Sequence, residues 1–328
     1  MAIFKGHYVL HILASYPIMN IDSTVKVSVI ICTYNRSELL RGSISAVLEQ
    51  SYPSDKYEIL VVDNNSSDDT PHVVASLASS SLVEIRYLFE KQQGLSYARN
   101  KGILCAKGEI IAFTDDDTLA QYNWIRAAVN AFDDMRVACV GGPVRPVWPM
   151  EKPHWLIARL EPYLAINEFD DARKQGFFNL PPVFPYGANI FFRKAIFSKL
   201  GLFRTNLGRK GLQLLTNDDV DMCAQIIAHG LRIAFAEHAV MLHKIAPDRM
   251  TKKWFIRRLY WQGRSDAVLG SNMSNMLGVR NSIYNLICRI FNSRSILSSA
   301  AHSIVFFGYL HQSVLIKMRS IHGRICNR

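Results

Sequence analysis

Three consecutive aspartates, Asp115, Asp116 and Asp117, follow directly after the strand-like run Glu109–Thr114. Side chains at positions i and i+2 of an extended backbone project the same way, so Asp115 and Asp117 should face one side. Carboxylate oxygens are the ligands that Mg²⁺ and Mn²⁺ prefer, and such a cation can also ligate a diphosphate. The cluster therefore predicts a divalent-cation site. The alternative is a helix start, whose dipole favours acidic residues in the first turn.

A second acidic cluster, Asp218-Asp219-Val220-Asp221, lies roughly 100 residues further along the chain. A carboxylate within reach of an acceptor hydroxyl could remove its proton. Crowding of carboxylates raises their pKa values, which suits a base at neutral pH. This cluster therefore predicts a general base, with a capped helix start as the alternative.

Other polar residues also stand near the ends of strand-like runs. Asp63 ends one such run, where its carboxylate could accept a hydrogen bond from the edge of a nucleotide base. Arg36 and Arg99 could contact the base or its phosphates. His243 could be a third metal ligand through an imidazole nitrogen. Taken singly, a basic residue is more often a solvated side chain than a ligand contact. A lone histidine near a strand end is likewise more commonly structural.

The elements that must position these clusters alternate between strands and helices. Strands that are apolar on both faces indicate a mostly parallel sheet with helices on each side, an α/β fold. In such sheets ligands bind outside the carboxyl ends of the strands, so polar clusters there should share one crevice. The expected strands are Val27–Cys32, Tyr57–Asp63, Val83–Phe89 and Glu109–Thr114, and the clusters at their ends are Thr33–Arg36, Asp63–Asp68 and Asp115–Asp117.

The second half of the sequence is less regular. Pro, Trp and Phe are frequent from Pro143 to Pro185, which indicates an irregular insertion or the start of an acceptor-facing region. Beyond it, apolar periodicity and the stop signal of Gly230 define further elements. These are strands at Tyr186–Phe192 and Arg232–Ala236, and helices at Lys194–Leu200 and from Asn217 through Ala228.

Several common enzyme classes lack support in the sequence. There is no GxGxxG after the first strand and no GxxxxGK[ST], so the phosphate-binding loops of nicotinamide-dependent enzymes and of P-loop proteins are missing. No GxSxG indicates a hydrolase nucleophile. The six cysteines are scattered without metal-ligand spacing and are typical of a reducing compartment.

The charge is concentrated at the end of the chain. Of the net charge of +11, residues 241–328 carry +12, with 14 Lys and Arg against Asp248 and Asp266. Such a segment could dock on nucleic acid or on an anionic lipid leaflet. Ser295–Ile316 contains 22 residues without a charge, but its polar side chains form one helical stripe. This pattern favours a helix lying at a membrane interface over a spanning one.

Together these residues resemble family 2 glycosyltransferases of the GT-A fold. Any one motif is weak, but their ordered set is specific. The motifs are VSVIICTYNR at Val27–Arg36, ILVVDNNSSDDT at Ile59–Thr70, GLSYARNKGI at Gly94–Ile103, GEIIAFTDDD at Gly108–Asp117, GANIFFRKAIF at Gly187–Phe197, LLTNDDVDM at Leu214–Met222, and His243.

The resemblance implies a role for each matched residue. The nucleotide-sugar donor would lie against Thr33, Tyr34, Asn35, Arg36, Asp63, Arg99 and Asp115. Asp117 and His243 would bind Mg²⁺ or Mn²⁺, and Asp219 would be the general base. Asn189 and Asp218 are candidates for the acceptor side. Asp218 stands where the family usually has Glu, and its shorter side chain makes this position a departure from the pattern.

The resemblance also implies a layout and a reaction. An N-terminal extension (1–24), in which Tyr8–Met19 is too short to span a bilayer, would precede a catalytic domain (25–245). Residues 25–120 would bind the nucleotide and 121–245 the acceptor, and 246–328 would form a basic helical region. The enzyme would invert the anomeric carbon, moving a sugar from a nucleotide-sugar, by family tendency a UDP-sugar, to a glycan or lipid-linked saccharide.

Such enzymes often build lipid-linked bacterial polysaccharides, which implies a peripheral position at the cytoplasmic face of the inner membrane, with an anionic surface and no nucleic acid as partner. Two other functions remain open. A sugar-phosphate nucleotidyltransferase should carry a Gly-rich basic loop near the first strand, and Thr33–Arg36 lacks glycine. A nucleic-acid-binding protein would use the basic segment but leave the acidic crevice unexplained.

Overall fold

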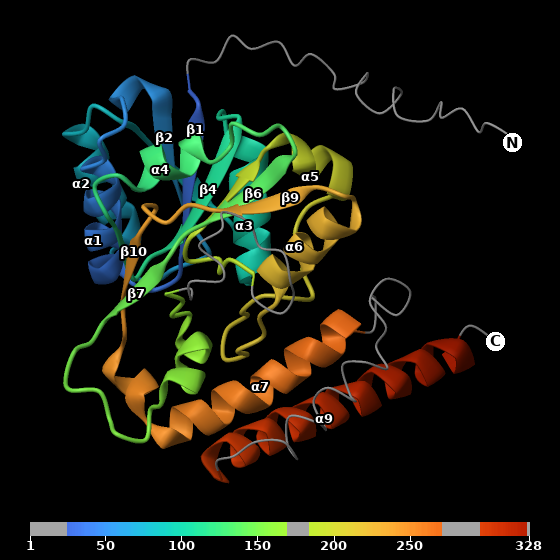
Figure 1. Cartoon of the computed structure of the whole chain (residues 1–328). Coiled ribbons are helices and arrows are strands. Elements are labelled where there is room, and N and C mark those ends of the chain that lie inside the picture. Colours follow the sequence, from blue (N-terminus) through green and yellow to red (C-terminus); the bar gives the residue numbers. More distant parts are fainter. Residues whose placement is uncertain (1–24, 169–183, 271–295, 327–328) are drawn as a thin grey trace, which may run out of the picture.

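A seven-stranded sheet lies at the centre of the molecule (Figure 1). The computed structural model describes residues 25–168, 184–270 and 296–326, so the predicted N-terminal extension 1–24 lies outside the described residues. Four of the strand pairs are parallel, and β8 runs antiparallel to both of its neighbours. The strand order is β3 (Glu84–Phe89), β2 (Tyr57–Asp63), β1 (Val27–Thr33), β4 (Ile110–Asp115), β8 (Ile190–Arg193), β6 (Val137–Gly141) and β9 (Arg232–Phe235).

Helices cover both faces of this sheet, because its strands are apolar on both sides. Alternate residues of β1 belong to different cores: Val29 and Ile31 face one, and Ile30 faces the other. The first core includes α1 (Ser37–Leu48), α2 (Thr70–Ser79) and α4 (Trp124–Asn130), and the second includes α3 (Leu95–Cys105), α5 (Ala195–Leu200) and α6 (Asp218–Ala228). The expected α/β fold with a mostly parallel sheet is confirmed.

Strand register brings the polar clusters to one edge of the sheet. Thr33 at the end of β1 lies opposite Asp63 at the end of β2. On the other side of β1, Cys32 lies opposite Asp115, the last residue of β4. β1, β2 and β4 therefore end at the same edge of the sheet, and the segments that follow them begin side by side.

A second, three-stranded sheet joins three short segments that are separate in the chain. It consists of β5 (Thr118–Ala120), β10 (Met241–Lys244) and β7 (Val144–Val147). His243 pairs with Thr118, which places it next to Asp117. The interpretation of 143–185 as irregular was wrong for β7 and for the 3₁₀ segment η2 (Ala158–Leu164). The short η1 (Ser54–Lys56) precedes β2.

The start of one expected strand also moved. The segment from Tyr186 to Asn189 forms a turn, and β8 begins only at Ile190. The turn is closed by the Asn189 N–H donating to the Tyr186 carbonyl over 2.8 Å, and within it the Gly187 N–H donates to Asp219. This turn has a role in the site described below.

Two long helices, α7 (Lys252–Gly270) and α9 (Ile296–Cys326), pack side by side below the sheet (Figure 1). The short η3 (Pro247–Met250) leads into α7. Gly263 and Gly308 allow the close approach, since a Cβ at either position would collide with the backbone of the other helix. Phe255 and Val305 join a third core with Leu160 of η2. None of the helices described is both long and apolar enough to cross a bilayer.

Candidate active site

A cavity of about 1140 Å³ opens at the carboxyl ends of β1 and β4, and chain segments from all parts of the fold line it. Both acidic clusters reach this one cavity, although they are far apart in sequence. The predicted site residues that line it are Thr33, Tyr34, Arg36, Arg99, Asp115, Asp117, Asp218, Asp219 and His243.

The middle aspartate of the first cluster, Asp116, holds the loop after β1. It is 5% exposed, and its carboxylate accepts hydrogen bonds from Thr33 Oγ1 and Arg36 Nη1, each over 2.8 Å. Burial raises the pKa of Asp116 to about 6, although the charge of Arg36 opposes this. Asp116 therefore orders the polar loop between β1 and α1, a role that the sequence did not indicate.

Asp117 is surrounded by cationic groups. Its Oδ2 accepts from Arg36 Nη1 over 3.0 Å and from Arg249 Nη2 over 3.1 Å, and its Oδ1 lies 3.4 Å from His243 Nε2. Burial alone would raise the pKa of Asp117, but the hydrogen bond to His243 and the charges of Arg249 and Arg36 hold it well below its usual range. Asp117 is therefore a permanent anion in the wall of the cavity.

His243 completes this group from the second sheet. The ring is 2% exposed, and its Nε2 also lies 3.3 Å from Arg249 Nη1. Its Nδ1 has no hydrogen-bond partner among the residues described. Since an imidazole nitrogen left without a partner in a buried position is costly, His243 has unused capacity to bind a ligand.

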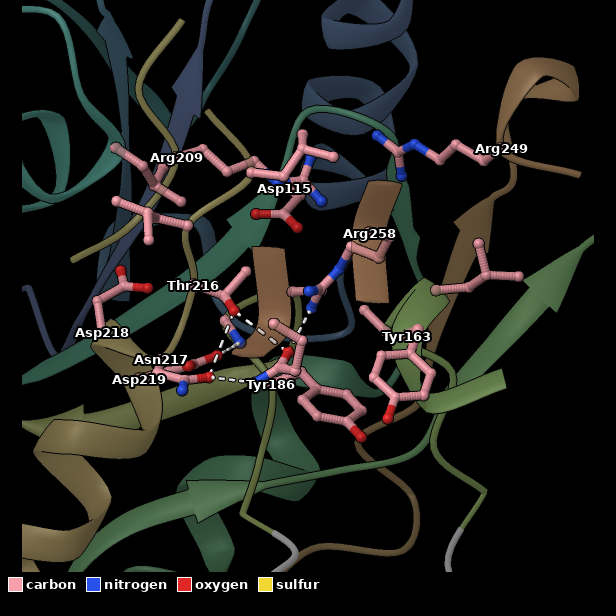
Figure 2. A pocket seen from close by; sticks show the side chains of 18 of the residues that line it. Asp115, Tyr163, Tyr186, Arg209, Thr216, Asn217, Asp218, Asp219, Arg249 and Arg258 are labelled. Atoms are coloured by element: carbon pink, nitrogen blue, oxygen red, sulfur yellow. Dashed lines mark hydrogen bonds between the residues drawn. The ribbon is translucent and has the colours of Figure 1, made fainter. Parts of the chain in front are cut away.

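The residues of this wall fit a divalent cation chemically. Asp115 is half-buried and faces the cavity (Figure 2), and together with Asp117 and His243 it supplies the oxygen and imidazole donors of a Mg²⁺ or Mn²⁺ site. Within the described residues, however, no group of three such side chains is already arranged around one point. The two guanidinium groups at Asp117 both contact its Oδ2, an oxygen that a cation would use.

The second acidic cluster begins helix α6. Asp218, at its first position, pairs with Arg99 of α3 through Oδ2 and Nη1 at 2.5 Å, and both side chains are about 5% exposed or less. Arg99, which the resemblance places beside the donor, lines the cavity and is paired there with Asp218. Gly187 packs directly against the Arg99 guanidinium, and a Cβ at this position would collide with it.

Asp219 differs from its neighbours because none of the described residues places a cation in direct contact with it. Its Oδ2 accepts from the backbone N–H of Gly187 over 2.9 Å, and its Oδ1 accepts from that of Val220 over 2.8 Å. Burial raises the pKa of Asp219 to about 6, and the charge of Asp218 acts in the same direction. A half-buried carboxylate with a raised pKa facing a cavity is suited to accept a proton.

Two predicted donor residues lie outside the cavity wall. Asp63 is 1% exposed, and its carboxylate accepts from the N–H of Ser66 over 2.8 Å and from the Tyr87 hydroxyl over 2.7 Å. Asn35, at φ 52°, donates its N–H to Ser66 Oγ over 2.9 Å and accepts from the N–H of Ser67 over 2.7 Å. Both therefore tie the loops after β1 and β2 together, and the neighbouring Asn64 lines the cavity instead.

Asn189 lies in the interior. It is fully buried, its Oδ1 accepts from Trp124 Nε1 over 2.7 Å, and its Nδ2 donates to the carbonyls of Pro143 and Ala239 over 2.9 and 2.8 Å. All of its polar groups are used within the fold. Asn189 therefore holds β8 to the segments beside β6 and β10, and it offers no atom to an acceptor.

Three arginines that the sequence did not single out also line the cavity: Arg209, Arg249 and Arg258. Figure 2 shows them entering it from three different segments. The only signal for them in the sequence was the high density of Lys and Arg after Met241, which covers two of the three. Density does not indicate which cations are buried, and that depends on contacts between distant segments.

Comparison with known proteins agrees with this geometry. The chain is 28% identical over 256 residues to glucosyl-dolichyl phosphate glucuronosyltransferase of Haloferax volcanii, covering 75% of this chain and 77% of the relative. It is 29% identical over 231 residues to glycosyltransferase AglE of the same organism, covering 70% of each chain. Both matches extend well beyond the first half of the chain.

Solved structures share the fold. The mannosyltransferase PcManGT from Pyrobaculum calidifontis, in complex with GDP-Man and Mn²⁺, superposes with a TM-score of 0.61 at 20% identity, covering 88% of this chain and 86% of the other. Staphylococcus aureus TarS 1-349, in complex with UDP, gives a TM-score of 0.51 at 15% identity, covering 90% and 92%. At these identities the likeness shows the GT-A fold alone.

The family itself follows from the model for glycosyl transferase family 2, which matches residues 28–201, more than half of the chain. The matched region runs from β1 through α5, so it contains Asp115–Asp117 and the elements that position them. With an α/β sheet of the GT-A type and two acidic clusters on one cavity, this chain is a glycosyltransferase that belongs to glycosyl transferase family 2.

Proposed function

We propose that the enzyme is an inverting, metal-assisted transferase that moves a sugar from a nucleotide-sugar, with UDP as the expected nucleotide, to a lipid-linked saccharide. The observation that carries this proposal is that Asp219 and the cluster Asp115–Asp117 line the same cavity. A base and an anion-binding wall on one cavity can hold the two reactants of a single displacement next to each other.

The donor lies on the β1 and β4 side in this proposal. Thr33, Tyr34 and Arg36 contact the nucleotide, because they line the cavity directly after β1. Asn35 and Asp63 support these contacts by holding the loop. Asp115, Asp117 and His243 would hold the divalent cation, which offsets the charge that develops on the leaving diphosphate. Arg36 and Arg249 supply further positive charge at the same place.

The acceptor lies on the α6 side. A carboxylate oxygen of Asp219 takes the proton of the acceptor hydroxyl while the hydroxyl oxygen forms a bond to the anomeric carbon of the donor sugar. The bond from that carbon to the diphosphate oxygen breaks on the opposite side, so the configuration inverts. Backbone N–H groups of Gly187 and Val220 keep the carboxylate directed toward the cavity. Asp218 contributes by holding Arg99 and the start of α6, rather than by touching the acceptor.

A lipid-linked acceptor fits the C-terminal helices. α9 carries a stripe of exposed apolar side chains, Phe307, Leu310, Val314 and Met318, at helical spacing. Apolar area on a helix next to basic residues is typical of binding in the interface of an anionic membrane. The relative that acts on a dolichyl phosphate-linked sugar agrees with this acceptor class. We infer a peripheral position at the cytoplasmic face of the inner membrane.

The test is a screen of nucleotide sugars with Mg²⁺ or Mn²⁺ present, measuring the nucleotide product. Release of a nucleoside diphosphate from one donor, absent after chelation, is expected. Release of pyrophosphate from a sugar phosphate and a nucleoside triphosphate would instead support a nucleotidyltransferase and contradict the proposal.

A further inference from the structure

The guanidinium group of Arg258 is buried without a full set of partners. Arg258 lies on α7, lines the cavity and is 7% exposed. Its Nη2 donates to Gln262 Oε1 over 2.9 Å, but Nε and Nη1 have no hydrogen-bond partner among the described residues. A buried cation with unused donors is costly, and such groups in native proteins usually have a ligand or a function.

The described neighbours of Arg258 orient it, but none of them forms an ion pair with it in direct contact. The ring of Tyr163 lies under the guanidinium, with 5.8 Å from Cζ to the ring centroid. Burial lowers the pKa of Arg258, while the phenol of Tyr163 and the carboxylate of Asp266 oppose that shift from further away. Asp266 Oδ1 already accepts from Gln262 Nε2 and from Asn217 Nδ2, each over 2.8 Å.

Arg258 belongs to the side of the cavity that holds the base. Hydrogen bonds connect α7 to the segment directly before Asp218. Ser265 Oγ accepts from the Thr216 N–H over 3.0 Å, and Gln262 Nε2 donates to Asn217 Oδ1 over 3.1 Å. The charge of Asp219 acts on Arg258 in turn. Figure 2 shows Arg258 reaching into the cavity near Asp219 and Tyr186.

The cations at Asp117, by contrast, are partly neutralised. Arg249 and Arg36 share the Asp117 carboxylate, which belongs to the wall assigned to the donor. An anion bound at Arg258 is therefore not needed to neutralise the donor wall. A group that reaches Arg258 while its hydroxyl lies at Asp219 must be part of the acceptor.

We propose that Arg258, supported by Tyr163, binds a phosphate group of the acceptor, the one that joins its saccharide to a lipid. This inference rests on the proposed function and names its acceptor class. The planar fork of a guanidinium matches two phosphate oxygens, and two unused N–H donors are what such a contact requires. Arg258 lies beyond residues 28–201, so the region that defines the family does not include it.

The test measures binding without turnover. Wild-type enzyme, saturated with UDP and Mg²⁺, is titrated calorimetrically with farnesyl phosphate, with farnesol and with inorganic phosphate. The variants are Arg258→Met, which removes the charge at similar length, and Arg258→Lys, which keeps the charge but not the fork. Lys253→Met is the matched control, because Lys253 is an exposed cation on the same helix that does not line the cavity.

Farnesyl phosphate should bind the wild type and Lys253→Met equally, and farnesol and inorganic phosphate should bind more weakly. Arg258→Met should weaken farnesyl phosphate binding by roughly 10- to 100-fold, the range for losing charge-assisted hydrogen bonds, and Arg258→Lys by less. UDP affinity, measured separately, should not change in any variant, which also shows that the variants are folded.

Three results would overturn the inference: equal farnesyl phosphate affinity in wild type and Arg258→Met, a loss of UDP affinity in Arg258→Met, or inorganic phosphate binding as tightly as farnesyl phosphate. The second would make Arg258 a donor contact, and the third a site for free phosphate. Failure of the proposed transferase reaction would appear separately, as a wild type that releases no nucleoside diphosphate from any donor.

Discussion

At the scale of single residues, the site is defined by how each buried carboxylate is neutralised. Asp116 and Asp117 share Arg36, and Asp218 pairs with Arg99, so cations fix these three side chains in place. Within the described part of the chain, the carboxylate of Asp219 accepts hydrogen bonds from backbone N–H groups alone. A carboxylate without a paired cation keeps its affinity for a proton, which is the property that a base needs.

Replacing Asp219 with Asn should abolish transfer while leaving donor binding intact. The amide keeps the size and one oxygen acceptor of the carboxylate but cannot take a proton. General bases contribute roughly 10²- to 10⁴-fold to rates, so kcat should fall by that factor. Nucleoside diphosphate release measures the rate, and UDP titration measures donor affinity. Unchanged turnover would remove Asp219 from the mechanism.

The pH dependence should reflect the same residue. Because the pKa of Asp219 is raised to about 6, kcat/KM should rise with pH through about 6 and level off above it, as the carboxylate loses its proton. The folded state holds this proton more tightly than the unfolded chain does. Stability from this group is therefore present at low pH and decreases between the ordinary carboxyl pKa and about 6.

Asp219→Asn provides the check on this assignment by urea unfolding. The stability difference between variant and wild type should shift in favour of the variant as pH rises from about 4 to 7 or 8, because only the wild type then gains a buried charge. A stability difference that does not change with pH would show that another group is responsible for the shift.

At the scale of elements, the site depends on contacts between helices and strand ends. The pair Arg99–Asp218 connects α3 to α6, and His243 brings β10 against the residue that follows β4. The helices themselves are locally encoded: apolar periodicity and the stop at Gly230 predicted α5 and α6 to within one residue of their ends. The local pattern does not encode which helix ends and strand ends come into contact with each other.

Breaking the link between α3 and α6 should destabilise the fold. Arg99→Met leaves Asp218 as a buried charge without its partner, so the free energy of unfolding should fall by about 3 to 5 kcal/mol. Lys26→Met is the control, because the Lys26–Glu109 pair is more than 40% exposed on both sides and should contribute less than about 1 kcal/mol. Equal losses in the two variants, measured by urea unfolding, would contradict the argument.

At the scale of the whole molecule, the chain places a reaction cavity between a nucleotide-binding sheet and a pair of basic helices. The third core, which joins η2 to α7 and α9, connects these helices to the lower wall of the cavity. A surface on α9 is thereby held at a set distance from Asp219. The division of the chain at residue 245 stays a prediction, because α7 contributes to the cavity as well as to the C-terminal helix pair.

The membrane orientation can be tested with vesicles. Phe307→Asp places a charge in the exposed stripe of α9, where Phe307 is 66% exposed, and should weaken cosedimentation with anionic liposomes without changing the fold. Leu82→Asp is the matched control, since Leu82 is 94% exposed and lies between α2 and β3, away from α9. Binding should fall as salt rises. Equal losses in both variants, or tighter binding to duplex DNA than to vesicles, would contradict the assignment.

The sequence by itself determined the strands β1, β2 and β4 and the polar clusters that follow them, because burial on both faces imposes a continuous apolar run that ends abruptly at a ligand-facing loop. It also singled out the two acidic clusters that the fold brings to one cavity. Only the tertiary structure decided their partners: Arg249 at Asp117, Arg99 at Asp218, and the place of Arg258 near Asp219. It likewise moved Asp63 and Asn189 from the cavity wall into the interior. These outcomes depend on contacts between residues far apart in the chain, and no local pattern of charge or hydrophobicity specifies which distant side chains will meet.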